Sequence, residues 1–163
     1  MVIRPAAPED HAAIRAVVTA AFGQPDEADL VDALRAAGDA LVELVAEADG
    51  AVVGHILFSP LATDTGARFA ALAPLSVLPG QQKDGLGTWL MQTGHELLRI
   101  GGVEAVIVLG HPDYYPRVGY SAQAAKMVTA PFAGPSFMAL TLKPGALDGP
   151  VTVTYAKAFG IAG

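Results

Sequence analysis

The sequence feature that most constrains the fold is the stretch 77–91, VLPGQQKDGLGTWLM, which predicts a strand end, a tight loop and the start of a helix. Gln82, Gly85 and Gly87 give this loop the form Q-x-x-G-x-G. Two glycines one residue apart permit positive φ angles and leave no side chains between the backbone and a ligand. The first amides of a helix are unpaired and lie at the positive end of its dipole. The stretch therefore predicts a site for a phosphate or pyrophosphate at a strand–loop–helix junction.

The segments around this junction predict a single α/β domain over residues 1–163 with a mixed, mostly antiparallel sheet. After the junction, the apolar run 103–109 predicts a buried strand, so that strand, helix and strand form a parallel crossover. The other expected elements are a strand at 2–4, helices from 8 to 22 and from 26 to Gly38, strands at 41–48, 51–58 and 68–78, a short helix within 110–120, and strands at 137–142 and 151–155.

Pro74 lies in the middle of the expected strand 68–78. Proline donates no hydrogen bond to a β-ladder, so the strand must be bulged or splayed at this residue. A splayed strand leaves backbone amides and carbonyls free to bind a ligand. An edge strand that tolerates proline explains the residue equally well, and both interpretations stay open at this point.

Charge and composition bound the partners and the compartment. The net charge is −6 and no cluster of Lys or Arg occurs, which argues against nucleic acid and mildly favours a cationic partner such as an amine. No apolar run is long enough to span a membrane, and the N-terminus lacks the apolar core of a signal peptide. The absence of Cys excludes disulfides and a thiolate nucleophile and favours the cytoplasm. The hydrophobic content of 52% also fits a homodimer with an apolar interface.

Two motifs in the chain together resemble the GNAT family of N-acetyltransferases. Val-Leu-Pro at 77–79 followed by Q-x-x-G-x-G at 82–87 resembles the acetyl-CoA signature of that family, and YYPRVGY at 114–120 resembles its F-Y-x-x-x-G-F segment. The order of the expected elements matches as well, and GHPDYYP at 110–116 is similar to a small bacterial subgroup of predicted acetyltransferases. The resemblance covers most of the chain. It implies a GNAT-like fold with helices on both faces of a splayed sheet, and acetyl-CoA as co-substrate.

The resemblance also implies particular roles for residues of the site. Backbone groups before the loop would bond pantetheine, loop amides would hold the CoA pyrophosphate, and amides near Val77 would polarise the thioester carbonyl. Tyr115 matches the family tyrosine that protonates the departing thiolate, and a phenol with a reference pKa of about 10 is protonated at neutral pH. The implied CoA-binding residues are Leu75, Ser76, Val77, Gln82, Lys83, Asp84, Gly85, Leu86, Gly87 and Thr88.

Two features depart from the family pattern. Asp84 places a carboxylate inside the loop, where it would repel pyrophosphate unless it points to solvent, although Lys83 can offset the repulsion. In addition, no Glu or Asp occurs between Ala70 and Leu78, so the common position of the family's general base is empty. A base would have to act through water or come from another part of the chain.

The histidines and one aspartate are the candidates for that base. His111 follows the strand 103–109, and we favour a hydrogen-bonding role at the strand end over catalysis. Asp113 is a further candidate. For His55 we favour a position on the sheet surface, and His95 is interpreted as a solvated helix residue. The spacing of His and carboxylate residues predicts no metal site.

The leading hypothesis is direct transfer of an acetyl group from acetyl-CoA to a primary amine. The acceptor stays open among small amines, antibiotics, polyamines, amino acids and peptide N-termini, and its specificity is expected to lie in loops and in the tail 123–135. The alternative is a CoA- or acyl-CoA-binding module without turnover, which the empty base position and Asp84 favour. A third class is a structural homo-oligomer in which the glycine loop is only a turn.

Overall fold

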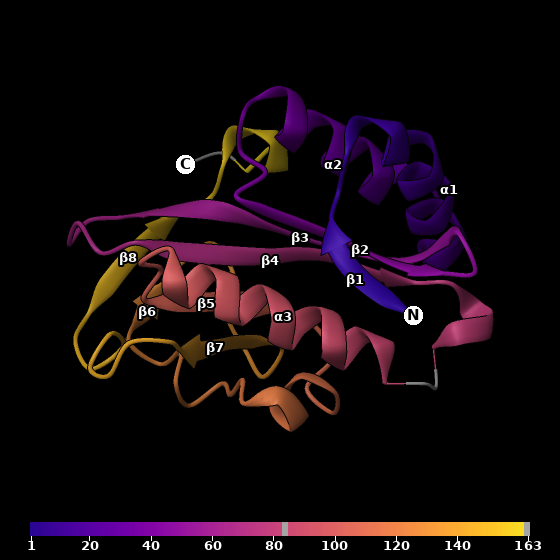
Figure 1. Cartoon of the computed structure of the whole chain (residues 1–163). Coiled ribbons are helices and arrows are strands. Elements are labelled where there is room, and N and C mark those ends of the chain that lie inside the picture. The colour runs from indigo at the N-terminus through magenta and orange to yellow at the C-terminus, as the bar shows by residue number, and fades with distance from the viewer. Residues whose placement is uncertain (83–84, 162–163) are drawn as a thin grey trace.

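The computed structural model describes residues 1–82 and 85–161. Helices α1 and α2 cover one face of a twisted sheet and α3 covers the opposite face (Figure 1). The helices are α1 (His11–Phe22), α2 (Asp26–Ala36) and α3 (Leu86–Ile100), and short 3-10 helices span Pro8–Asp10, Pro79–Gln81, Tyr115–Val118 and Lys157–Phe159. The strands are β1 (Val2–Pro5), β2 (Val42–Ala48), β3 (Ala51–Thr63), β4 (Phe69–Val77), β5 (Ala105–Leu109), β6 (Val128–Thr129), β7 (Phe137–Thr141) and β8 (Val151–Thr154).

The strands form one mixed sheet in the order β1-β2-β3-β4-β5-β7. Neighbours along this path are antiparallel except β4 and β5, which are parallel and are joined by α3. The strand β8 leaves the path, pairing with the end of β3 and with the short β6. The sequence-based prediction of a mostly antiparallel sheet with a parallel crossover and helices on both faces is therefore confirmed.

The sheet splays at the position that Pro74 marks in the sequence. Pairing between β4 and β5 ends at Ala71 opposite Ile107. On the other side of β4, the register with β3 shifts between Ile56 and Phe58, which is the signature of a β-bulge. Because β4 lies between two partner strands, the splayed-strand interpretation is correct and the edge-strand interpretation is wrong.

Successive side chains of the central strands point to opposite faces of the sheet, so each face has its own core. Val45 and Leu57 pack under α1 and α2, whereas Ile56 and Phe58 pack under α3. Helix α3 approaches the sheet closely because Gly94 has no side chain: a Cβ there would collide with the Phe58 ring. The two cores hold both helical layers against the same strands and so fix the geometry at the splay.

The strand β3 is longer than predicted, because it continues through Pro60 to Thr63. Proline interrupts a ladder only where a neighbouring strand needs its N–H. Pro60 lies between Phe58, the last β3 residue that pairs with β2, and Ala62, the first that pairs with β8. No described strand needs the missing donor in this gap, so the ladder to β4 can continue past the proline.

Two further differences concern the tail and the surface. The sequence predicts no strand between 123 and 135, but Val128 and Thr129 form β6, a two-residue strand parallel to β8. So short a strand depends on its partner and has no periodicity of its own to detect. In the part of the chain that the structure describes, no helix has the length and apolar character that a membrane crossing requires.

Candidate active site

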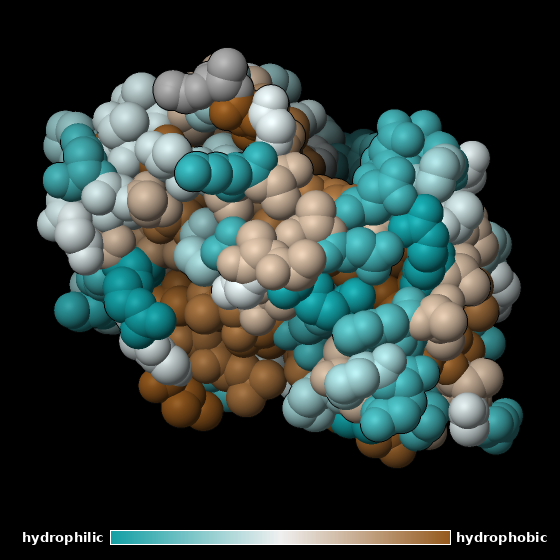
Figure 2. Space-filling model, turned by 90° about the horizontal axis from the view of Figure 1, so that it is seen from above, coloured by the Kyte–Doolittle hydropathy of each residue, from teal (hydrophilic) through white to brown (hydrophobic). Residues whose placement is uncertain are grey.

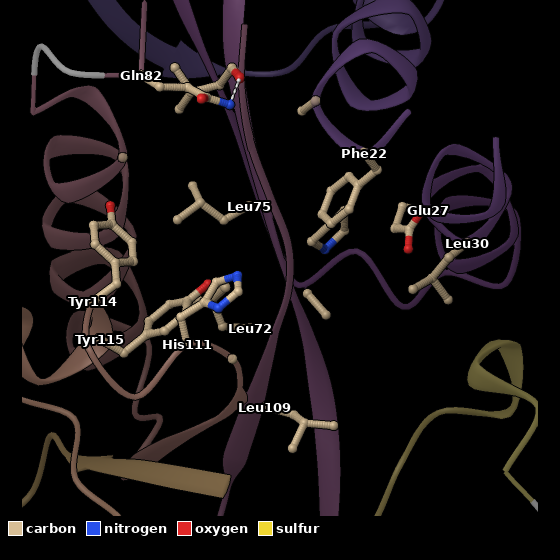
Figure 3. A pocket seen from close by; sticks show the side chains of 16 residues that line it. Phe22, Glu27, Leu30, Leu72, Leu75, Gln82, Leu109, His111, Tyr114 and Tyr115 are labelled. Carbon is tan, nitrogen blue, oxygen red and sulfur yellow. Dashed lines mark hydrogen bonds between the residues drawn. The ribbon is translucent and has the colours of Figure 1, made fainter. Parts of the chain in front are cut away.

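A cavity of about 660 Å³ lies where β4 diverges from β5. One wall comes from α1 and α2, the floor from β4, and the opposite wall from the segment that follows β5. Figure 3 shows the two walls facing each other across Leu72 and Leu75. The labelled residues are Phe22, Glu27 and Leu30 on one wall and His111, Tyr114 and Tyr115 on the other.

One end of the cavity meets the start of α3. Gly85 caps this helix in the left-handed conformation with φ of 71°, which favours glycine. The first helical bond runs from the Trp89 amide to the Gly85 carbonyl at 3.1 Å, and the amides of residues 85–88 donate to no acceptor among the described residues. Gly87 lines the cavity, and a Cβ at this position would collide with the Tyr114 hydroxyl. The first turn of α3 therefore offers a small anion helix-end amides that have no partner among the described residues.

A side-chain hydrogen bond ties the loop to the end of β4. The Gln82 amide Nε2 donates to the Val77 carbonyl at 3.2 Å (dashed in Figure 3). Both residues line the cavity together with Leu75 and Gly87. The chain thus brings the glycine loop and the splayed strand to one end of the same cavity.

The other residues implied by the resemblance lie differently. The side chains of Ser76 and Leu86 are buried outside the cavity lining, Leu86 against the core beside Gly54, so only their backbone atoms can serve a ligand. Thr88 is half-buried and also outside the lining. Lys83 and Asp84, which the resemblance also implies, lie outside the described residues.

Tyr115 is held rigidly in the wall opposite α1 and α2. Tyr115 is 9% exposed. Its ring packs edge-on against the rings of Tyr114 and Tyr120, with distances between ring centroids of 5.2 Å and 5.7 Å. Gly110 lies against the ring, since a Cβ there would collide with it. Burial, with the neighbouring Tyr114 second, raises the pKa of Tyr115 to about 12, so the phenol is protonated at neutral pH.

Behind Tyr115 lies a buried pair that sequence reasoning missed. His95 of α3 is 8% exposed and its Nε2 shares a hydrogen bond of 2.6 Å with the Tyr120 hydroxyl. The interpretation of His95 as a solvated residue is therefore wrong. The pair fastens the turn that carries Tyr115 to the helix that begins at the glycine loop.

The buried pair predicts an acid-sensitive stability. Burial lowers the pKa of His95 to about 4, from 6.5 in an exposed histidine. Above pH 6.5 the ring is neutral in both states, whereas between pH 6.5 and 4 the unfolded chain binds the proton first. The free energy of unfolding should therefore fall on acidification across this window, by about 3 kcal/mol from this group.

Denaturant unfolding at a series of pH values measures the effect. His95→Gln should flatten the decrease between pH 6.5 and 4. Comparing variants also isolates His95 from His55, whose pKa burial lowers too. Identical pH profiles for His95→Gln and the parent chain would contradict the assignment.

The candidates for a general base differ in whether they line the cavity. His111 has an exposed imidazole that lines the cavity, and its carbonyl accepts the amides of Tyr114 at 3.1 Å and Tyr115 at 3.3 Å. The turn is thus held by the His111 backbone, and the expected side-chain bond at the strand end is not formed with any described residue. Asp113 is exposed and outside the cavity lining.

His55 is fully buried rather than on the sheet surface. Its Nε2 lies 2.8 Å from a carboxylate oxygen of Glu43, which also pairs with Arg35 at 2.6 Å. Bonds from both partners outweigh burial and lower the pKa of Glu43 to about 2. The cluster links α2 to the sheet outside the cavity lining, so its role is structural.

The wall formed by α1 and α2 was not predicted as part of the site. Phe22, Glu27 and Leu30 appear in the sequence as ordinary residues of two amphipathic helices, and only the packing of these helices on the sheet brings them to the cavity. The tail 123–135, where acceptor specificity was expected, contributes no described residue to the lining. Its residues instead cover a smaller core beside β7 and β8.

Comparison with known proteins decides the family. Residues 11–120 match the acetyltransferase (GNAT) family. The chain belongs to this family. Among curated GNAT relatives, the uncharacterized N-acetyltransferase YjhQ of Escherichia coli K12 is 42% identical, with 86% of this chain and 84% of the relative covered. The uncharacterized N-acetyltransferase YhbS of the same strain is 35% identical over 76% of this chain and 75% of its own length.

Solved GNAT structures share the whole architecture. Escherichia coli YhbS, crystallised in complex with CoA, is 32% identical with a TM-score of 0.91, covering 99% of this chain and 93% of that one. A GNAT acetyltransferase from Brucella melitensis, in complex with acetyl-CoA, is 37% identical with a TM-score of 0.81 and 97% of both chains covered. Within residues 1–82 and 85–161, no group of three or more His, Cys, Asp or Glu side chains is placed to hold a metal ion.

Proposed function

We propose that this GNAT chain transfers an acetyl group from acetyl-CoA directly to a primary amine. The observation that carries the proposal is that one cavity joins the start of α3, the splayed β4 and the protonated Tyr115. The CoA complex of YhbS and the acetyl-CoA complex of the Brucella melitensis enzyme, both similar to this chain, support the choice of co-substrate.

The residues around the cavity fit the co-substrate part by part. The amides of residues 85–88, with the rest of the loop from Gln82 through Lys83 and Asp84, would receive the pyrophosphate. Beyond Ala71 the β4 edge that faces β5 has no described partner strand. Backbone groups of residues 75–77 on this free edge would bond pantetheine and place the thioester carbonyl near the Val77 amide.

The chemistry requires positioning and one proton donor. The neutral amine attacks the thioester carbonyl, and its nitrogen–carbon bond forms before the carbon–sulfur bond breaks. Tyr115 then gives its hydroxyl proton to the departing sulfur. The surplus proton of the amine leaves through the open cavity, where His111 of the lining would accept it. No covalent acyl-enzyme is needed, in keeping with the absence of Cys from the chain.

Calorimetry and a thiol-release assay test this function in sequence. We expect the protein to bind CoA and then to release free thiol from acetyl-CoA in the presence of a suitable primary amine. Binding without release across a broad amine panel would favour the non-catalytic CoA-binding module. No CoA binding at all would reject both and leave the glycine loop as a structural turn.

The setting of the enzyme is part of the same proposal. We propose one catalytic domain over residues 1–163 acting in the cytoplasm, for which the lack of Cys is the supporting observation.

A homodimer is compatible with the apolar residues exposed along α3, where Trp89, Leu97 and Ile100 share one side of the helix. Seen from above, the largest brown (hydrophobic) area of the surface lies at the lower left, smaller ones lie elsewhere, and hydrophilic residues cover much of the rest (Figure 2).

A further inference from the structure

The structure assigns the acceptor to a chemical class. We propose that it is an amine on an apolar body, without a carboxylate or phosphate group, and that Glu27 selects it. This inference rests on the proposed acetyl transfer and deepens it, because it chooses among the amines that the reaction alone leaves open. Three properties of the cavity carry it: its apolar walls, the sign of its charge, and the placement of Glu27.

The walls of the acceptor end are apolar although they are open to solvent. Phe22 is 42% exposed and Leu109 is 48% exposed, and both line the cavity with Leu30 and Leu72. A single exposed leucine is ordinary on a protein surface, but several large apolar side chains converging on one concave site are typical of a binding pocket. Burial of these side chains against an aryl or branched alkyl group of a ligand would stabilise the complex.

The charge of the lining disfavours anionic acceptors. Among its described residues, Glu27 is the one carboxylate, and neither Lys nor Arg is present. The guanidinium groups of α1 and α2 are engaged elsewhere, Arg15 with Asp29 and Asp32, and Arg35 with Asp32 and Glu43. A carboxylate or phosphate on the acceptor would thus lose its hydration with no Lys or Arg among the described lining residues to pair with it, and protonated His111 would be its one cationic partner there.

Glu27 is placed to attract and orient an ammonium group. It lies in the first turn of α2, and the Gln24 side-chain amide bonds its two oxygens at 3.2 and 3.3 Å. In Figure 3 it lies on the wall opposite Tyr115, between Phe22 and Leu30. A single negative charge in a low-dielectric cleft concentrates cations there. It would bring the amine in as ammonium and place it between the two walls, above β4, where the ammonium must release one proton to solvent in the open cavity before the neutral amine can attack.

Three amines test the substrate class with the intact protein. 2-Phenylethylamine has the apolar body, phenylalanine adds a carboxylate to it, and ethanolamine lacks the apolar body. We expect kcat/KM for 2-phenylethylamine to exceed that for each of the other two by about 100-fold. Comparable values for phenylalanine or ethanolamine would overturn the inference while leaving acetyl transfer intact.

Matched variants test the residues. Glu27→Gln should raise KM for 2-phenylethylamine about tenfold with KM for acetyl-CoA unchanged. Glu9→Gln, the same substitution at an exposed position outside this cavity, should change neither constant. Leu109→Asn should raise KM for 2-phenylethylamine. The ratio of kcat/KM for 2-phenylethylamine to kcat/KM for ethanolamine should therefore become smaller. An unchanged KM for 2-phenylethylamine in Glu27→Gln would remove this carboxylate from acceptor selection.

A binding measurement separates this inference from the proposed function. Calorimetry on the CoA-saturated protein should detect 2-phenylethylamine, with weaker binding in Glu27→Gln and no binding of phenylalanine. If this pattern holds while no amine releases thiol from acetyl-CoA, the acceptor site stands and the transferase fails. If no amine binds the CoA-saturated protein, the inference is overturned whatever the thiol-release assay shows.

Discussion

Tyr115→Phe should lower kcat by roughly ten- to a thousandfold with little change in KM for acetyl-CoA. The substitution keeps the ring that packs between Tyr114 and Tyr120 and removes only the hydroxyl that would protonate the departing sulfur. Without this proton donor the thiolate must leave unaided or wait for water, so the loss falls on the chemical step. Steady-state kinetics with varied acetyl-CoA at saturating 2-phenylethylamine, or another accepted amine, measures both constants.

Tyr155→Phe provides the control for this prediction. Tyr155 is also largely buried, which raises its pKa to about 12, but it packs against Phe132 and Phe159 and does not line the cavity. It should leave kcat unchanged. If Tyr115→Phe retained the kcat of the parent chain, the hydroxyl would have no part in the reaction and another group would have to protonate the leaving group.

Gly87→Ala should weaken CoA binding by about 10- to 100-fold, the equivalent of one hydrogen bond to a charged group. The added methyl would collide with the Tyr114 hydroxyl, so either this side chain or the first turn of α3 must move. Either movement disturbs the amides proposed to hold the pyrophosphate. Isothermal calorimetry with CoA measures the change, and circular dichroism verifies that the variant is folded.

Gly80→Ala is the matched control, because a Cβ at this position would meet no atom within 4 Å. Gly80 lies in the 3-10 helix before the loop and outside the cavity lining, so CoA affinity should be unaffected. Equal affinities for the Gly87→Ala and Gly80→Ala variants would place the pyrophosphate away from the start of α3. The acetyl-transfer proposal would then lose its main structural support.

The sequence was sufficient for those parts of the site that depend on backbone conformation. Gly85 and Gly87 mark the start of α3, and Pro74 marks the splay, because each residue type restricts the local chain in a way that can be recognised without the fold. The order of strands and helices followed from periodicity and turns. These features determine where a co-substrate would lie.

The acceptor wall could not be predicted, because it is created by packing. Phe22 and Glu27 belong to two amphipathic helices, and the sequence does not say which end of the sheet these helices border. His95 is a different case. It lies four residues after Met91 and three before Leu98, both buried, so helical spacing did carry the signal for its burial. The interpretation of His95 as a solvated residue followed from its polar side chain and not from this spacing.

The divergence of β4 and β5 separates the proposed acceptor side of the cavity from the proposed co-substrate side. In our proposal, the hairpin of α1 and α2 would form most of the wall that recognises the acceptor, the segment after β5 would supply the proton donor, and the start of α3 would supply the anion site. Substitutions in the hairpin should then alter which amine is accepted without disturbing the thioester chemistry on the other side. Such modularity makes this chain a favourable scaffold for evolving new acceptor preferences, with libraries confined to α1 and α2.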